Sequence, residues 1–116
     1  MEEIVNAPGK VIIAPEVLIT IAKLSTLSVS GVVRMAAVSG GIDRYLKRGY
    51  ADGVRIQVLN HTLLADLYIV VRGDSNMHTV SSEVKEEVTR AFAEMVGMQA
   101  KTVNVHVEDV MFIDDQ

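Results

Sequence analysis

The amino-acid sequence predicts an α+β fold in which two helices pack on one face of a mainly antiparallel sheet. One observation is a stripe of apolar residues over 76–96 whose spacings of three and four are typical of an amphipathic helix. Its members are Val80, Val84, Val88, Ala91, Phe92 and Met95. The other observation is that segments of alternating polarity lie on both sides of this helix and can form a sheet that buries the stripe. The expected order is strand, helix, three strands, helix, strand.

The first part of the chain predicts a flexible end, a short strand and a helix. Residues 1–8 are expected to be flexible, and residues 11–13 form an apolar run that predicts a strand. Pro15 suits the first turn of a helix, where its missing N–H is harmless, so we expect a helix over 15–27. Ala14 is a poor residue for the cap position of that helix.

Three strands are expected in the middle of the chain. The first covers residues 32–38, between Gly31 and the glycines that end it. The alternation over 54–58 is typical of a half-buried strand. A hairpin connection at 60–62 then leads to a strand over 63–71.

The main helix has clear ends, and a last strand follows it. Asn76 can cap its first turn, and Gly97 suits a left-handed C-terminal residue. Alternating valines predict a strand over 103–112, with either a bulge near 108–109 or two covered faces where the alternation changes phase. This strand could lie parallel to the one at 63–71, with a right-handed crossover. The tail at 114–116 is expected to be flexible.

Length and composition indicate one domain over residues 1–116, with a core of aliphatic side chains. No apolar run approaches the roughly 20 residues that span a bilayer, and the start of the chain lacks the basic region of a signal peptide. The absence of cysteine excludes disulfides, thiolate catalysis and cysteine-based zinc sites. A net charge of −4 argues against nucleic-acid binding. We therefore expect a cytoplasmic protein without a membrane span.

The groups that could carry chemistry form no recognisable motif. His61, His78 and His106 lie in a turn, at a helix start and in a strand, without the spacing of a metal site. Solvated surface histidines are the expectation, and a site shared with Asp66 or Asp109 is the alternative. The glycines match neither spacing of a phosphate-binding loop, and nothing resembles G-x-S-x-G, although a fold can assemble a triad from distant residues. We expect no catalytic residue, no metal and no cofactor.

The segment 42–50 differs in character from the rest of the chain. It interleaves basic and aromatic residues with a single acid, Asp43, in a protein of net charge −4. Tyrosine and arginine are enriched where proteins meet, and long connections often carry function. A solvated loop is the alternative. The sequence predicts a partner contact made by Arg44, Tyr45, Lys47, Arg48 and Tyr50.

Several short motifs carry a family resemblance. They are the opening at 9–17, the pairs Ile21-Ala22 and Gly31-Val32, the strand end at 70–73 before a long helix, and the run at 103–107, which is the most specific. Together they resemble the bacterial alkaline shock protein family, also called the Gls-type general or envelope stress protein family, over residues 9–113. The chain departs from it at Ala14, where a Ser-like cap is usual, and at Arg72, where an aromatic is common.

The resemblance implies a small, non-enzymatic cytoplasmic protein linked to alkaline shock and cell-envelope stress. Some members sit at the membrane through a partner protein, and others look connected to lipid metabolism; the family offers no catalytic residues to transfer. Our main hypothesis is a non-catalytic scaffold or adaptor that forms a homo-oligomer and binds protein partners, including a membrane-associated one. The alternative is a regulator of lipid metabolism that binds a small molecule or an enzyme partner in a pocket between helix and sheet.

Overall fold

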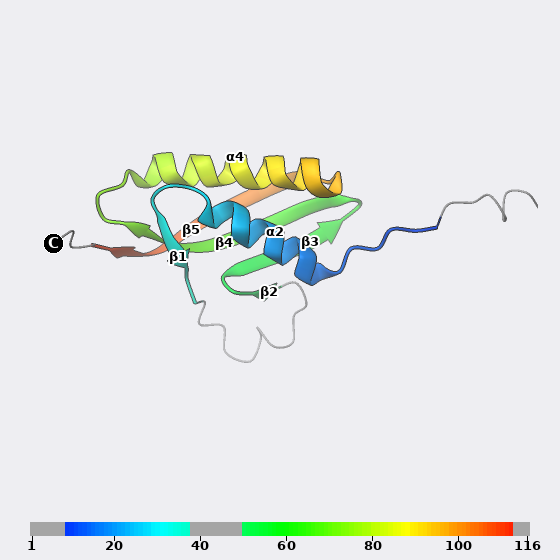
Figure 1. Cartoon of the computed structure of the whole chain (residues 1–116), viewed down its shortest axis with the longest axis horizontal. Helices are drawn as coiled ribbons and strands as arrows, with labels where there is room; N and C mark the ends of the chain where they lie inside the picture. Colours follow the sequence, from blue (N-terminus) through cyan, green and yellow to red (C-terminus); the bar gives the residue numbers. More distant parts are fainter. Residues whose placement is uncertain (1–8, 38–49, 113–116) are drawn as a thin grey trace, which may run out of the picture.

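The computed structural model describes residues 9–37 and 50–112, which form two helices and five strands (Figure 1). In chain order these are α2 (Pro15–Leu27), β1 (Val32–Met35), β2 (Tyr50–Ala51), β3 (Val54–Leu59), β4 (Thr62–Arg72), α4 (Met77–Val96) and β5 (Gln99–Met111). The flexible ends expected at 1–8 and 114–116 lie outside the described residues. The helix predicted over 15–27 is confirmed with the same bounds.

The strand β4 is the centre of the sheet. β5 runs parallel to it along one edge, over the full length of β4. The other edge is shared, because β3 pairs antiparallel with the first half of β4 and β1 pairs antiparallel with the second half. The two meet at Tyr68, whose N–H donates to the carbonyl of Gly53 at 2.8 Å and whose carbonyl accepts from the N–H of Ala36 at 2.7 Å. β2 extends the sheet beyond β3.

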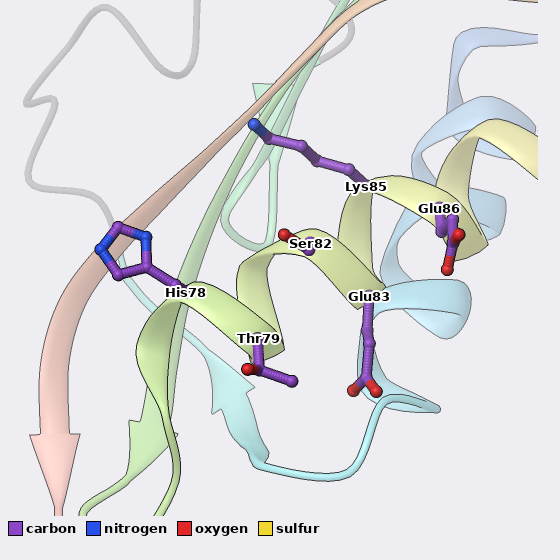
Figure 2. A pocket seen from close by; sticks show the side chains of 6 residues that line it. All are labelled: His78, Thr79, Ser82, Glu83, Lys85 and Glu86. Atoms are coloured by element: carbon purple, nitrogen blue, oxygen red, sulfur yellow. The ribbon is translucent and has the colours of Figure 1, made fainter.

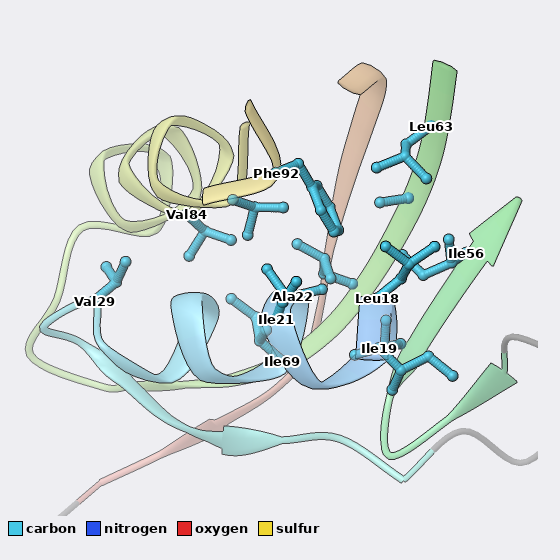
Figure 3. Packing of buried hydrophobic residues seen from close by; sticks show 14 of the residues in the cluster. Leu18, Ile19, Ile21, Ala22, Val29, Ile56, Leu63, Ile69, Val84 and Phe92 are labelled. Atoms are coloured by element: carbon cyan, nitrogen blue, oxygen red, sulfur yellow. The ribbon is translucent and has the colours of Figure 1, made fainter. Parts of the chain in front are cut away.

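Both helices lie on the same face of this sheet, as the apolar stripe predicts (Figure 1). The buried cluster between the two layers is aliphatic apart from Phe92, whose ring points from α4 toward the sheet (Figure 3). Burial of this apolar surface is the main stabilising term of the fold. The cluster includes Leu18, Ile21, Ala22, Val54, Leu63, Ala65, Leu67, Ile69, Val71, Val84, Val88 and Phe92.

The ends of α4 follow the prediction. The side-chain oxygen of Asn76 accepts a hydrogen bond from the N–H of Thr79 at 3.0 Å. Gly97 ends the helix with φ of 67°, a left-handed conformation that is cheapest for glycine. The stripe is correct at its buried positions but wrong at Met95, which is 67% exposed. The buried line advances four residues at a time from Val80 to Phe92, so its next member is the half-buried Val96.

The strand predicted at 11–13 does not form. Residues 9–14 are in no helix or strand, and Val11 and Ile12 are 88% and 85% exposed. An apolar run becomes a strand only where another strand offers its backbone groups, and within the described residues none is placed beside this segment. The run has the composition of a strand, but its sequence does not reveal whether another strand lies beside it.

The remaining strands differ from the prediction mostly at their ends. β1 stops at Met35 rather than continuing to residue 38, and β5 starts at Gln99 rather than at 103. The parallel pairing of the strand at 63–71 with the last strand is confirmed. The bulge near 108–109 is confirmed as well, because Val107 pairs with Ile69 while Asp109 pairs with the very next residue, Val70.

Candidate functional site

An apolar groove runs between α2 and α4 on the outer side of the helix layer. Its volume is about 380 Å³. Three of its apolar side chains are open to solvent: Val17 is 45% exposed, Leu24 is 61% exposed and Met95 is 67% exposed. Val17 and Leu24 are exposed because the buried face of α2 is formed by residues such as Leu18 and Ile21, which point into the core. The full lining is Glu16, Val17, Thr20, Ile21, Leu24, Ser25 and Met95.

One acid lines the groove, and acidic residues outnumber basic ones on α4. α4 carries four glutamates and two basic residues, and Glu16 lines the groove from α2. One of those bases, Arg90, donates to the carboxylate of Glu87, and this hydrogen bond raises the pKa of the guanidinium above its ordinary value, with smaller contributions from the charges of Glu87 and Glu94. The groove therefore has a mainly apolar lining with one carboxylate, that of Glu16.

A second, wider depression of about 590 Å³ lies along the first half of α4 (Figure 2). All six of its lining residues come from that one helix. In Figure 2 the ring of His78 and the amine of Lys85 point to one side, whereas the carboxylates of Glu83 and Glu86 point to another. An acid, a base and a nucleophile that act together must converge on one point, and these side chains diverge.

A polar cluster occupies the face of the sheet away from the helices. Asp66 alternates with the buried Leu67 and so faces the other way. Its Oδ1 accepts a hydrogen bond from Asn104 at 3.1 Å and lies 3.0 Å from Nε2 of His106. The His106 ring stacks on Tyr68, with ring centroids 4.3 Å apart. These contacts join β4 to β5, so the cluster has a structural role in the sheet.

The three histidines do not assemble a metal site. His61 lies in the β3–β4 hairpin, His78 in the first turn of α4 and His106 in β5. Of the alternative site with Asp66, the structure shows one contact, between Asp66 and His106. Among residues 9–37 and 50–112 no group of three histidine, aspartate or glutamate side chains could hold a metal ion.

The predicted contact segment falls mostly outside the structure. Arg44, Tyr45, Lys47 and Arg48 lie outside the described residues, and only the backbone of Tyr50 is described, paired with Arg55 at the start of β2. Its role therefore stays a prediction.

The sequence reasoning missed the groove. The available signal was the pair Val17 and Leu24, which recur seven residues apart on α2, but their partner Met95 is distant in sequence.

Comparison with solved structures shows the same fold in chains of very different sequence. The copper form of MamM CTD gives a TM-score of 0.57 at 14% identity and covers 87% of this chain and 91% of that chain. The zinc form of a MamM CTD variant gives a TM-score of 0.57 at 13% identity, with the same coverage. At such identities the likeness concerns the fold alone. In the described part of the chain, neither helix is long and apolar enough to cross a bilayer.

Comparison with known sequences places the chain in a family. The uncharacterized protein YqhY of Bacillus subtilis (strain 168) is 28% identical over 106 residues, which cover 90% of this chain and 78% of that protein. The uncharacterized protein Spy1614 of Streptococcus pyogenes serotype M6 is 26% identical over 111 residues, or 92% of each chain. A model of the alkaline shock protein 23 family, described by a cell envelope-related function, matches residues 3–112. The motif resemblance is thus confirmed, and the chain belongs to the alkaline shock protein 23 family.

Proposed function

We propose that the chain is a non-catalytic scaffold or adaptor in the cell-envelope stress response, acting through self-association and through protein partners. The observation that carries the proposal is the open apolar groove between α2 and α4, where Val17, Leu24 and Met95 are exposed together. Contiguous apolar surface of this kind marks interaction sites on soluble domains. The family description, a cell envelope-related function, sets the cellular context.

The groove fits an amphipathic helix of a partner protein. It lies between two helices, and its lining on α2 runs from Glu16 to Ser25, about 14 Å along the helix axis. A helix docked there would place apolar residues at successive turns on Val17, Leu24 and Met95. The carboxylate of Glu16 favours a partner helix with a basic residue at its margin.

The chemistry of the described surface supports a role without catalysis. In the polar cluster around Asp66, the carboxylate contacts Asn104 and His106 from the neighbouring strand. The depression along α4 has diverging side chains. We place the protein in the cytoplasm and propose that it reaches the membrane through such a partner rather than by a segment of its own.

Capture of envelope proteins tests this function. The Leu24→Lys variant puts a charge into the middle of the groove, and Leu59→Lys is the matched control because Leu59 is 57% exposed on β3, away from the groove. Solubilised membrane proteins from envelope-stressed cells should be retained by the unchanged protein and by the control, and lost with Leu24→Lys. Equal retention by all three proteins would contradict the proposal.

The alternative function, binding of a small molecule in lipid metabolism, is favoured by the volume of the groove. About 380 Å³ lies within the usual range of ligand pockets, roughly 300–1,000 Å³. Ligand pockets enclose most of their ligand, however, and the exposure of Leu24 and Met95 shows an open trough. Native mass spectrometry distinguishes the two functions, since a co-purified lipid-like mass that Leu24→Lys removes would favour the ligand.

A further inference from the structure

Residues 9–12, here called the arm, are an extended apolar segment without a place in the fold. Val11 and Ile12 are the most exposed large apolar residues of the described chain, at 88% and 85%. In the described part of the structure, no backbone hydrogen bond ties the arm to a strand or loop. The arm thus presents both apolar side chains and free backbone groups, the two requirements for adding a strand to a sheet.

Among the described strands, the outer edge of β5 is an unpaired strand edge to which the arm could add. Within residues 9–37 and 50–112 β5 pairs only with β4, so its outer edge is free along its length. Its helix-side valines are only half-buried, although the β4 residues that they pair with are buried completely. A strand beyond β5 would cover the open side of Val105 and Val107.

The arm cannot reach this edge in its own chain. It runs directly into α2, since Ala14 is the cap residue of that helix and Ile13 packs against its own core. α2 packs on the β1 and β3 side of the sheet, and the arm leaves it away from β5 (Figure 1). The position beyond β5 lies three strand spacings from β3, about 14 Å away, with no spare residues to cross that distance. The free edge that fits the arm is therefore that of another molecule.

Charge and pattern select one register. If Lys10 lies opposite Glu108 in an antiparallel pair, Val11 falls opposite Val107 and Ile12 opposite His106. Val11 then meets the half-buried valines on the helix side, while Lys10 meets the acidic pair of Glu108 and Asp109, both exposed. A parallel register that matches Val11 to Val103 puts Lys10 opposite Thr102 and loses the ion pair.

We propose that the arm adds as an antiparallel strand to the outer edge of β5 in a second copy of this chain, with Lys10 opposite Glu108 and Val11 opposite Val107. The inference rests on the self-association in the proposed function and identifies the surfaces that carry it. Among the described residues two other edges are open, and both fit less well. The edge of β1 carries Arg34 and no acid for Lys10, and the start of β3 is already occupied by β2. The remaining stretch of β3, Ile56 to Leu59, offers no acid to Lys10.

Crosslinking between copies tests the register in a chain that has no cysteine of its own. Differently tagged Val11→Cys and Val107→Cys proteins are mixed and oxidised. Directly opposite residues of an antiparallel pair lie about 4.5–5.5 Å apart at Cα, within the range that a disulfide spans. We expect a mixed disulfide between the two variants.

Two further mixtures serve as matched controls. Val11→Cys with Val58→Cys probes the edge of β3, and Val11→Cys with Met95→Cys probes the groove; both target side chains are exposed. The proposal predicts much less disulfide in both controls. An equal or larger yield with either, or no disulfide in any mixture, would overturn it. The groove variant Leu24→Lys should crosslink normally, so loss of partner capture and loss of arm pairing are distinguishable.

Charge reversal gives a second readout without cysteine. Sedimentation velocity over a concentration series should show a several-fold weaker self-association for Lys10→Glu, because the reversed charge faces Glu108 and Asp109. Lys85→Glu, the same change on the exposed face of α4, should leave the association unchanged. Equal weakening by both variants would show that only net charge matters and would overturn the register.

Discussion

At the scale of single residues, Phe92 is a large side chain that joins the two layers. Its side chain is fully buried, and it is the aromatic residue of the core cluster. Leu63 and Ile69 of β4 belong to the same cluster (Figure 3). A large side chain in this position fills space that neighbouring valines are too short to reach.

Replacement of Phe92 by alanine should therefore be costly. The expected loss in the free energy of unfolding is about 3–5 kcal/mol, because the substitution removes buried surface and leaves a cavity. Urea denaturation measures it. Met95→Ala, on the exposed side of the same helix, should change stability by less than about 0.5 kcal/mol. A loss below about 1 kcal/mol for Phe92→Ala would show that α4 faces another way.

Gly31 is required where the chain passes beneath α4. Its φ is 102°, and a Cβ added there would lie 2.7 Å from Cγ2 of the buried Val80. The Gly31→Ala variant should lose about 1–3 kcal/mol from the backbone alone and more from the clash. Gly97→Ala is the control, since its φ is also positive but the space around it is open, and it should lose about 1–2 kcal/mol. Equal losses in denaturant melts would contradict the packing of Val80 on Gly31.

The turn between β4 and α4 contains an ion pair between Arg72 and Asp74. Arg72 donates to both carboxylate oxygens of Asp74, at 3.0 and 3.2 Å, and these hydrogen bonds hold the pKa of Asp74 below its ordinary value. A folded-state pKa that is lowered contributes stability above the unfolded pKa, and this is lost as pH falls through the folded value. Because Asp74 is exposed, the contribution is small.

Side-chain NMR should report this pair directly. Arg72→Gln should raise the pKa of Asp74 toward 3.8, its ordinary value, and Arg55→Gln should leave it unchanged. A pKa of Asp74 that does not respond to Arg72→Gln would mean that the pair does not persist in solution.

At the scale of elements, the parts that sequence predicts well are those set by local chemistry. Pro15, Asn76 and Gly97 fix helix ends through the backbone groups that they supply or lack, and each lies where it was expected. The parts that failed depend on distant partners. The run at 11–13 has the composition of a strand but no neighbour within the described residues. The start of β5 was missed because Gln99 and Lys101 interrupt the apolar pattern at an exposed end.

The candidate site shows the same division. The acidic face of α4 is visible in the sequence, but the groove requires knowing that Met95 lies beside α2. Seven residues separate Val17 from Leu24, and a pattern within one helix does not reveal which of its two apolar faces meets the sheet. Only the assembled fold distinguishes the face of α2 that enters the core from the face that stays exposed.

The segment 42–50 remains a predicted contact element. Charge reversal at Lys47 and Arg48 to glutamate should leave the melting temperature nearly unchanged, because unpaired buried charges are costly and these side chains should reach solvent. The same variant should capture fewer protein partners, and added salt should weaken capture by the unchanged protein. Unchanged capture would mean a merely solvated loop, and unfolding would mean that the segment belongs to the core.

At the scale of the whole molecule, three features point outward: the groove between α2 and α4, the arm and the free edge of β5 within the described part of the chain. Four large apolar side chains that the core does not bury are exposed to solvent: Val11, Ile12, Leu24 and Met95. Such exposed apolar surface is typical of interaction sites. Sheet edges left open in this way invite pairing between molecules. A scaffold needs such surfaces in pairs, one for its own copies and one for its partners.

Self-association is the central claim, and light scattering coupled to size-exclusion chromatography tests it most directly. The chain has a mass of 12.6 kDa. At tens of micromolar we expect a measured mass of at least twice that value, falling toward it on dilution and in the Lys10→Glu variant. A constant 12.6 kDa over the whole concentration range would contradict both the proposed scaffold function and the proposed pairing of the arm with β5 of a second copy.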